Sequence, residues 1–200
     1  MRKIILIIPV FALLILGFNK TIAGDVIGHV DTDPNKTKFK ANTVVYIEKV
    51  DGNFKPPTKN PEMNQKNLIF IPHVMPILAG TTVGFLNSDD VLHNVFSPDA
   101  CAGKFNLGSW KKGDVKTYKY DKVGCMSVLL CNVHPEMEAY IVVLQNPYYA
   151  LTDKDGNFSI KNVPAGKYVI KVWNEKLKSA SQEVTVKASG KVDINFMLKK

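Results

Sequence analysis

The sequence predicts an all-β protein, and three observations support this fold class. The apolar residues come in short runs, without a long stretch of helical period. β-Branched and aromatic residues dominate these runs. Gly, Pro, Asn and Asp separate the runs, and many short strands with turn signals between them are typical of β-sandwiches and barrels.

The expected strands fall into two sets, one before and one after Pro147. The first set comprises residues 25–30, 43–50, 67–71, 81–87, 115–120, 126–131 and 139–145. The second set comprises residues 157–160, 167–173, 182–187 and 191–198. The polar segment 51–67 contains three prolines and is predicted to be a loop or covering segment.

The N-terminal segment has the order of a secretory signal peptide. Two basic residues precede an apolar run from Ile4 to Phe18, and "TIA" then offers small or neutral residues. We expect cleavage after Ala23. The alternative, a retained membrane anchor, is less favoured because the run is shorter than the roughly 20 residues of a spanning helix. The mature protein is therefore expected in the periplasm or cell envelope, without stable membrane insertion.

Composition and charge exclude several classes of protein. Hydrophobic residues make up 46% and charged residues 22%, which indicates a globular chain rather than a disordered one. Removal of the leader takes three of the 26 basic residues and leaves 23 against 18 acidic residues, a formal charge of +5. Because no stripe of Lys and Arg with interleaved aromatics is present, nucleic-acid binding is not expected.

The segment "LLCNVHPEMEAY" (129–140) places three metal-binding side chains on one short loop. Cys131, His134 and Met137 follow one predicted strand and precede the next, and His93 in "LHN" lies after another predicted strand. Each residue alone has an ordinary structural use. Two imidazoles, a thiolate and a weak thioether together are the donor set of an electron-transfer copper site.

The order His93, Cys131-x-x-His134-x-x-Met137 resembles the cupredoxins, the type 1 copper proteins. The short loop with Pro135 is most similar to the amicyanin-like variety. The resemblance covers residues 43–145 and implies a Greek-key β-sandwich with one type 1 copper, held by His93, Cys131 and His134 with Met137 as the axial ligand. It also implies that Asn94 ties the two ligand loops together near the Cys131 sulfur. Glu136 departs from the pattern, since that family carries an apolar residue there.

The other two cysteines, Cys101 and Cys125, both fall within the region of the resemblance. We expect them to form a disulfide, because an exported protein meets an oxidising compartment, although two unpaired buried thiols remain an alternative. Pairing them leaves Cys131 free as the thiolate. A zinc site made by Cys131, His134 and these two cysteines is conceivable but leaves His93 and Met137 without a role.

Two histidines remain outside the motif and are interpreted as structural. His29 lies in a predicted strand, and His73 lies between prolines in "IPHVMP". A second, catalytic copper would need further histidine ligands, so the chain is not expected to be an enzyme. A calcium loop at "DKDGN" (153–157) is also not favoured, because the twelfth position counted from Asp153 is Pro164 rather than glutamate.

The C-terminal stretch resembles carboxypeptidase-regulatory-like, or prealbumin-like, β-sandwich modules. "TDKDGNF" and "VPAGKY" carry this resemblance, and the Asp-Gly step and "NVPAG" (162–166) are predicted turns. The expected organisation is a signal peptide (1–23), a copper-binding domain (24–147) and a β module (148–200). In an alternative arrangement, the early strands 24–50 pair with the module and the copper domain is an insertion in it.

The expected function is single-electron transfer between redox proteins by one type 1 copper. The positive charge favours a partner with an acidic docking patch. Copper storage or delivery, and an envelope interaction function carried by the module, are the alternatives.

Overall fold

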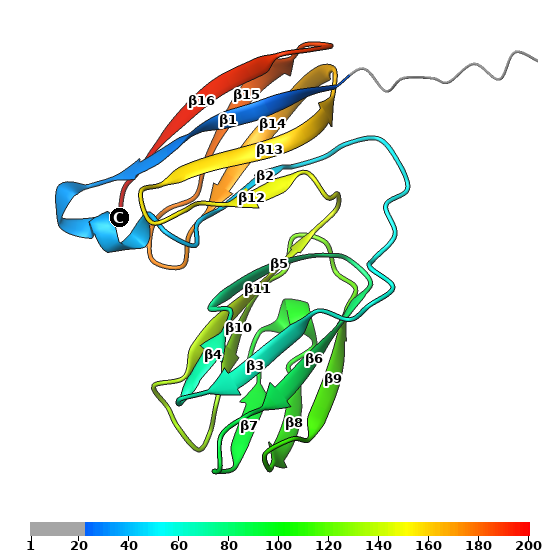
Figure 1. Cartoon of the computed structure of the whole chain (residues 1–200), viewed down its shortest axis with the longest axis vertical. Helices are drawn as coiled ribbons and strands as arrows, with labels where there is room; N and C mark the ends of the chain where they lie inside the picture. The colour runs from blue at the N-terminus through cyan, green and yellow to red at the C-terminus, as the bar shows by residue number, and fades with distance from the viewer. Residues whose placement is uncertain (1–22) are drawn as a thin grey trace, which may run out of the picture.

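The computed structural model describes residues 23–200 and consists of two β-sandwiches (Figure 1). The signal-peptide prediction lies almost entirely on residues 1–22, outside the described part. Within that part, no helix is both long and apolar enough to span a membrane. Two short 3-10 helices interrupt the strands, η1 (Pro34–Phe39) and η2 (Ala100–Ala102).

The first sandwich, which we call the module, is built from both ends of the chain. One of its sheets has the strand order β13 (Asn157–Pro164), β1 (Ala23–Thr32), β16 (Lys191–Leu198). The other has the order β12 (Tyr149–Leu151), β2 (Val44–Ile47), β14 (Gly166–Trp173), β15 (Ala180–Val186). β1 pairs in parallel with the last strand, β16.

The second sandwich, which we call the inserted sandwich, lies between β2 and β12 in the sequence. One sheet has the order β4 (Ile69–Ile71), β3 (Glu62–Lys66), β6 (Thr81–Asn87), β9 (Val115–Tyr120). The other has the order β5 (Val74–Leu78), β11 (Glu138–Leu144), β10 (Met126–Leu130), β7 (His93–Phe96), β8 (Asn106–Trp110). The early strands β1 and β2 therefore pair with strands that follow Pro147, and not with the strands of residues 62–144.

Each sandwich has its own apolar core. The module packs Ile47, Ile170 and Phe196 with their neighbours, and the inserted sandwich packs Phe85 and Leu129 with theirs. Buried residues alternate with exposed ones along the strands that form these cores. In β16, for example, every second residue from Ile194 to Leu198 is buried. A strand with that pattern covers a core with one face only.

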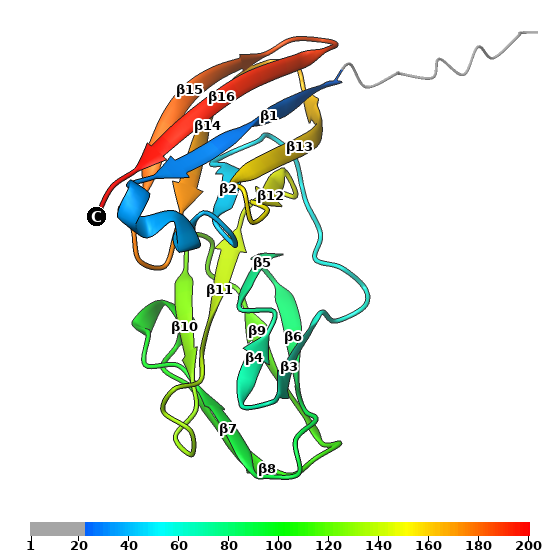
Figure 2. The same ribbon diagram turned by 60° about the vertical axis from the view of Figure 1, so that its left-hand side comes forward.

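A third, smaller cluster joins the two sandwiches. Val44 of the module packs with Val74, Val142 and Leu144 of the inserted sandwich, and Tyr140 and Trp173 lie against them. The two chain crossings are also tied together, because the side-chain amide of Gln145 accepts from Val50 N and donates to Val50 O, each at 3.1 Å. Figure 2 shows β11 rising from the inserted sandwich to the module at this junction.

Several local predictions were wrong. Segment 51–67 is not wholly a loop, since β3 lies within it, and the predicted turn 162–166 is shorter because β13 continues to Pro164. β5, β7, β8 and β12 were not predicted as strands. Prolines, bends and few β-branched residues mask these short strands, whose pairing is set by neighbours distant in the sequence.

Candidate metal centre

The loop between β10 and β11 carries three of the predicted ligands. Leu130 and Glu138 pair across the two antiparallel strands, so Cys131 begins the loop and Met137 ends it. The Met137 N–H donates to the His134 carbonyl at 3.0 Å, which closes a tight turn at His134. The hairpin thus fixes the positions of all three residues within the seven residues from Cys131 to Met137.

His93 reaches the same place from β7, where it is the first residue. β7 pairs with β10 through Phe96 and Leu130, which brings His93 next to the start of the β10–β11 loop. His93 is also paired with Trp110 of β8 and is completely buried. The side chain of His93 therefore lies inside the sandwich rather than on its surface.

Three donor atoms converge at this end of the inserted sandwich. His93, Cys131 and His134 each contribute one donor atom, and these three atoms lie within 4.8 Å of one another. The two Nδ1 atoms are 3.1 Å apart, and the Cys131 Sγ lies 4.0 Å from His134 Nδ1. Two imidazoles bound in a trigonal plane, with metal–nitrogen bonds of about 2.0 Å, place their nitrogens about 3.5 Å apart. The donor spacing therefore fits a metal ion.

The carboxylate of Asp89 fixes the tautomer of His93. His93 Nε2 lies 2.8 Å from Asp89 Oδ2, and an ionised carboxylate only accepts hydrogen bonds. Nε2 must then carry the proton, which leaves the lone pair of Nδ1 directed toward Cys131 and His134. A carboxylate that orients a metal-binding imidazole in this way is a common feature of metal sites.

Asp89 also holds the β3–β4 turn, and the sequence did not predict its role. Its carboxylate accepts the N–H groups of Asn67 at 2.7 Å and Leu68 at 3.0 Å. Both turn residues have positive φ, which is unusual for leucine. Burial opposes ionisation of Asp89, but the hydrogen bonds from Leu68, His93 and Asn67 outweigh it and lower its pKa. The only available signal was an acid four residues before His93.

Asn94 links the two ligand segments. Its backbone N–H donates to Cys131 Sγ at 3.5 Å, and its side-chain oxygen accepts from Asn132 N at 3.3 Å. Its side-chain nitrogen donates to Asn106 Oδ1 and Gly108 O, both at 2.8 Å. The first pair of contacts restrains the loop at Cys131 and Asn132, and the second pair anchors Asn94 to β8.

Met137 and Glu136 differ in their surroundings although they are adjacent. Met137 is fully buried in the same core cluster as Cys131, whereas Glu136 is exposed. The donor atoms of His93, Cys131 and His134 form the three-atom cluster, and Met137 ends the same loop as Cys131 and His134. The loop therefore presents a buried thioether beside an exposed carboxylate.

The remaining cysteines and histidines lie elsewhere. Cys101 and Cys125 form the predicted disulfide, so they cannot serve the zinc site considered above, and Cys131 is free and buried. His29 contacts Asn157 on the outer face of the module. His73 contacts Glu138 and Glu175 at the junction of the sandwiches.

Glu138 follows Met137 directly and takes part in a charged cluster. Partial burial opposes its ionisation, but hydrogen bonds from Tyr140 and Lys176 outweigh this and lower its pKa. Burial and the same carboxylate raise the pKa of Tyr140. The strand leaving the ligand loop thus begins with an ionised carboxylate.

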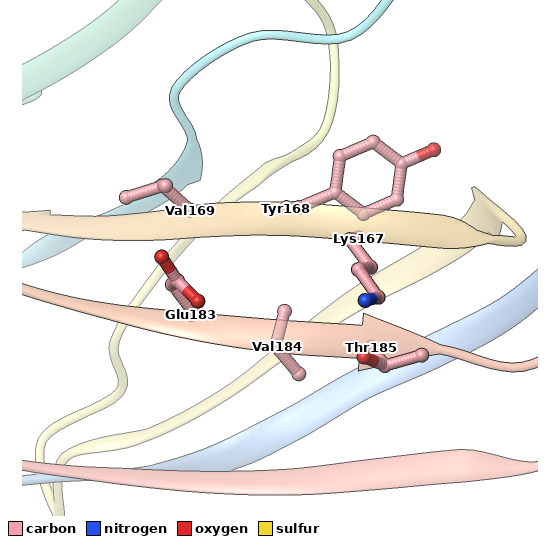
Figure 3. Close-up of a pocket in the computed structure, with 6 residues that line it drawn as sticks. All are labelled: Lys167, Tyr168, Val169, Glu183, Val184 and Thr185. Atoms are coloured by element: carbon pink, nitrogen blue, oxygen red, sulfur yellow. The ribbon is translucent and has the colours of Figure 1, made fainter.

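A hollow of about 480 Å³ lies on the module and is separate from these residues (Figure 3). Charged groups of Lys167 and Glu183 lie over the space between β14 and β15 in that view. Its lining comprises Lys167, Tyr168, Val169, Glu183, Val184 and Thr185. It contains none of the predicted ligands.

Comparisons with known proteins describe the two parts separately. A family model for the carboxypeptidase regulatory-like domain matches residues 135–199. That match covers the module strands β12–β16 and extends back through β11. No curated protein matches the chain.

Solved structures similar to this chain include amicyanins and a purple cupredoxin. A methionine-to-alanine mutant of amicyanin in the Cu(I) form is 19% identical, with a TM-score of 0.40, over 42% of this chain and 81% of that one. A reduced tryptophan-to-tyrosine mutant of amicyanin is 17% identical, with a TM-score of 0.41, over 51% and 98%. A purple cupredoxin from Nitrosopumilus maritimus is 23% identical, with a TM-score of 0.38, over 42% and 99%.

Proposed function

We propose that this chain is an exported protein that carries single electrons by means of one type 1 copper. The observation that carries the proposal is the convergence of His93 Nδ1, His134 Nδ1 and Cys131 Sγ at one end of the inserted sandwich. Two imidazoles and a thiolate favour copper over harder cations, and a nearby thioether is the usual weak fourth donor. Bound copper would supply a one-electron couple between Cu(I) and Cu(II).

The residues of the chain would hold the ion with little freedom to move. Cys131 would bind as the thiolate, His93 and His134 would complete the plane, and Met137 would be the axial ligand. Asp89 keeps the His93 lone pair free for the ion, and Asn94 restrains Cys131. Ligands fixed by paired strands change position little between oxidation states, which favours rapid electron transfer.

His134 is the proposed route for electrons to a partner. It is partly exposed, whereas His93 is fully buried. The residues just before the two histidines are exposed and apolar, with Leu92 at 55% and Val133 at 47%. We propose that a redox partner contacts this apolar surface, with Glu136 at its edge.

Charge on the chain is uneven, which refines the expected partner. Residues 55–146 hold nine lysines and eight acidic residues, so the excess of positive charge lies mainly on the module. An acidic patch on the partner would then be attracted to the module more than to the metal end. We expect apolar contacts to dominate at His134 itself.

Burial of the donors favours electron transfer over copper delivery. His93 and Met137 are 0% exposed and Cys131 is 3% exposed. A carrier must release its ion to a recipient, which requires ligands that a competitor can reach. Export is proposed from the predicted leader and is consistent with the disulfide.

Reversible reduction tests this proposal. The copper-loaded protein should accept one electron from ascorbate, return it to ferricyanide, and keep its copper for hours against a chelator. The His134→Ala variant should lose this cycle, whereas His29→Ala, which changes a histidine of the module, should retain it. Failure of the Cu(II) form to accept an electron, or copper loss within minutes, would contradict electron transfer.

A further inference from the structure

A network of side chains connects the end of the ligand loop to the module. Glu138, the residue after Met137, is held at both its carboxylate and its carbonyl. Its carboxylate accepts from Lys176 Nζ at 2.9 Å and from the Tyr140 hydroxyl, and its carbonyl lies 3.0 Å from His73 Nδ1. The backbone that carries Met137 is therefore fixed by contacts outside the ligand loop.

Two members of this network belong to the module. Glu175 and Lys176 lie in the connection between β14 and β15 (Figure 2). Glu175 Oε1 is 2.9 Å from His73 Nε2, and Glu175 Oε2 is 3.4 Å from Lys176 Nζ. The two charges thus contact His73 and Glu138 of the inserted sandwich and also each other.

The β14–β15 connection is itself anchored. Asn174 Oδ1 accepts the N–H groups of Lys176 at 3.0 Å and Leu177 at 3.2 Å. Asn174 Nδ2 donates to Phe39 O at 2.9 Å and to Thr43 Oγ1 at 2.7 Å. A connection held this way can position what it contacts, because its own backbone is fixed by the module.

Aromatic packing continues the same contact. The Tyr140 and Trp173 rings have centroids 5.3 Å apart, and the Lys176 ammonium lies 5.9 Å from the Tyr140 centroid. The His73 ring packs edge-on against Tyr140 at 5.7 Å.

The ion pairs are partly exposed, with Lys176 at 46% and Glu138 at 35%, so they contribute little to global stability. Their effect is expected locally, on the adjoining loop.

We propose that Glu175 and Lys176 are positioning residues through which the module holds the Met137 end of the ligand loop. Lys176 acts on Glu138 directly, and Glu175 acts through His73. The proposal rests on the function proposed above, since it assigns Met137 as the axial ligand. It predicts that the metal centre responds to changes on the other sandwich.

The first test uses the full chain without metal. Hydrogen exchange of the Met137 amide, which donates to the His134 carbonyl, reports the order of the loop. Lys176→Met and Glu175→Ala should each raise this exchange several-fold, and Lys176→Arg should restore protection. Lys161→Met is the matched control, because Lys161 also forms a 2.9 Å ion pair, with Asp25, on the outer sheet of the module. Unchanged exchange in Lys176→Met and Glu175→Ala would overturn the proposal.

The second test separates positioning from simple charge. Lys176→Met removes a positive charge and Glu175→Ala a negative one, so through-space electrostatics shifts the copper reduction potential in opposite directions. If each substitution instead loosens Met137, the reduction potentials of the two variants shift in the same direction, and this is the result we expect. Opposite shifts, or none, would overturn the proposal. A wild-type protein that binds no copper would refute the proposed function, while the exchange measurement would still report on the contact.

Discussion

Both sandwiches bury polar side chains that are hydrogen-bonded to one another, such as Ser97 and Ser127 in the inserted sandwich, but the inserted sandwich also buries a histidine and a cysteine that converge. The module buries Thr43, Thr152 and Asn174, which are bonded to one another or to nearby backbone. The inserted sandwich buries His93 and Cys131, whose donor atoms face each other and His134. Among the described residues, buried side-chain atoms without a hydrogen-bond partner also fall only in the inserted sandwich: Asn64, Gln65, Thr81, Trp110 and Tyr120.

The buried polar side chains of the two sandwiches have different expected roles. Buried polar groups that satisfy each other stabilise a fold, whereas imidazole nitrogens and a thiol sulfur that converge on one point can bind a metal ion. Under the proposed function, the module serves as a scaffold and the inserted sandwich holds the metal centre.

The largest expected effect on stability comes from the disulfide of the inserted sandwich. Replacing both Cys101 and Cys125 with alanine should lower the free energy of unfolding by about 3 kcal/mol, because the bond closes a loop of 24 residues. Denaturant unfolding of the metal-free protein measures this. Cys125 lies just before the start of β10, whereas Cys131, His134 and Met137 follow the end of β10, so copper binding should survive. An unchanged midpoint would show that the bond is not structural.

Asn174→Ala should be the most damaging polar substitution in the module. It removes four hydrogen bonds and should cost about 2 kcal/mol, since buried partners are left unsatisfied. Denaturant unfolding again measures the loss. Asn195→Ala, which changes an exposed asparagine of β16, is the control and should cost much less. Equal costs would contradict the structural role assigned to the buried polar cluster.

Asp89→Asn should weaken copper binding more than it weakens the fold. The amide can present its N–H group to His93 Nε2, which removes the constraint that keeps the proton on that nitrogen. Loss of such an orienting carboxylate typically lowers metal affinity by about tenfold or more. Competition with a chelator measures the affinity. Asp90→Asn, at the exposed neighbouring residue, should leave it unchanged.

The smallest expected effect is a pH dependence at the module turn 153–157. Asp153 accepts hydrogen bonds from Asn157 N and Asp155 N, and these lower its pKa. A lowered pKa means that its contribution to stability is present above the ordinary carboxyl value and is lost as pH falls through the lowered one. The difference between wild type and Asp153→Ala should therefore shrink as the pH falls below the ordinary carboxyl value and vanish below the lowered pKa of Asp153. A difference that stays constant from pH 7 to acid would contradict this.

The sequence predicted the all-β class and the Cys101–Cys125 bond correctly. It also named three predicted ligands, His93, Cys131 and His134, that the structure brings together. These features depend on local spacing, because a strand–loop–strand hairpin determines where the residues of "CNVHPEM" lie. The roles assigned to the individual ligands remain predictions.

Features that depend on distant pairing were not predictable in the same way. Asp89 contacts both Asn67 and His93 because β3 and β6 lie side by side, which no local pattern indicates. The contact of Lys176 with Glu138 likewise requires the docking of two sandwiches across 38 residues of sequence. Such contacts follow from the tertiary fold and not from propensity or spacing.

The visible absorption spectrum of the copper-loaded protein tests the central claim most directly. The wild type should show an intense band at the red end of the visible range, from charge transfer between the Cys131 thiolate and Cu(II). Cys131→Ser should bind copper without this band, because a hydroxyl cannot provide that transition. A colourless wild-type protein, or a Cys131→Ser variant that keeps the band, would contradict the assignment of Cys131 and with it the type 1 site.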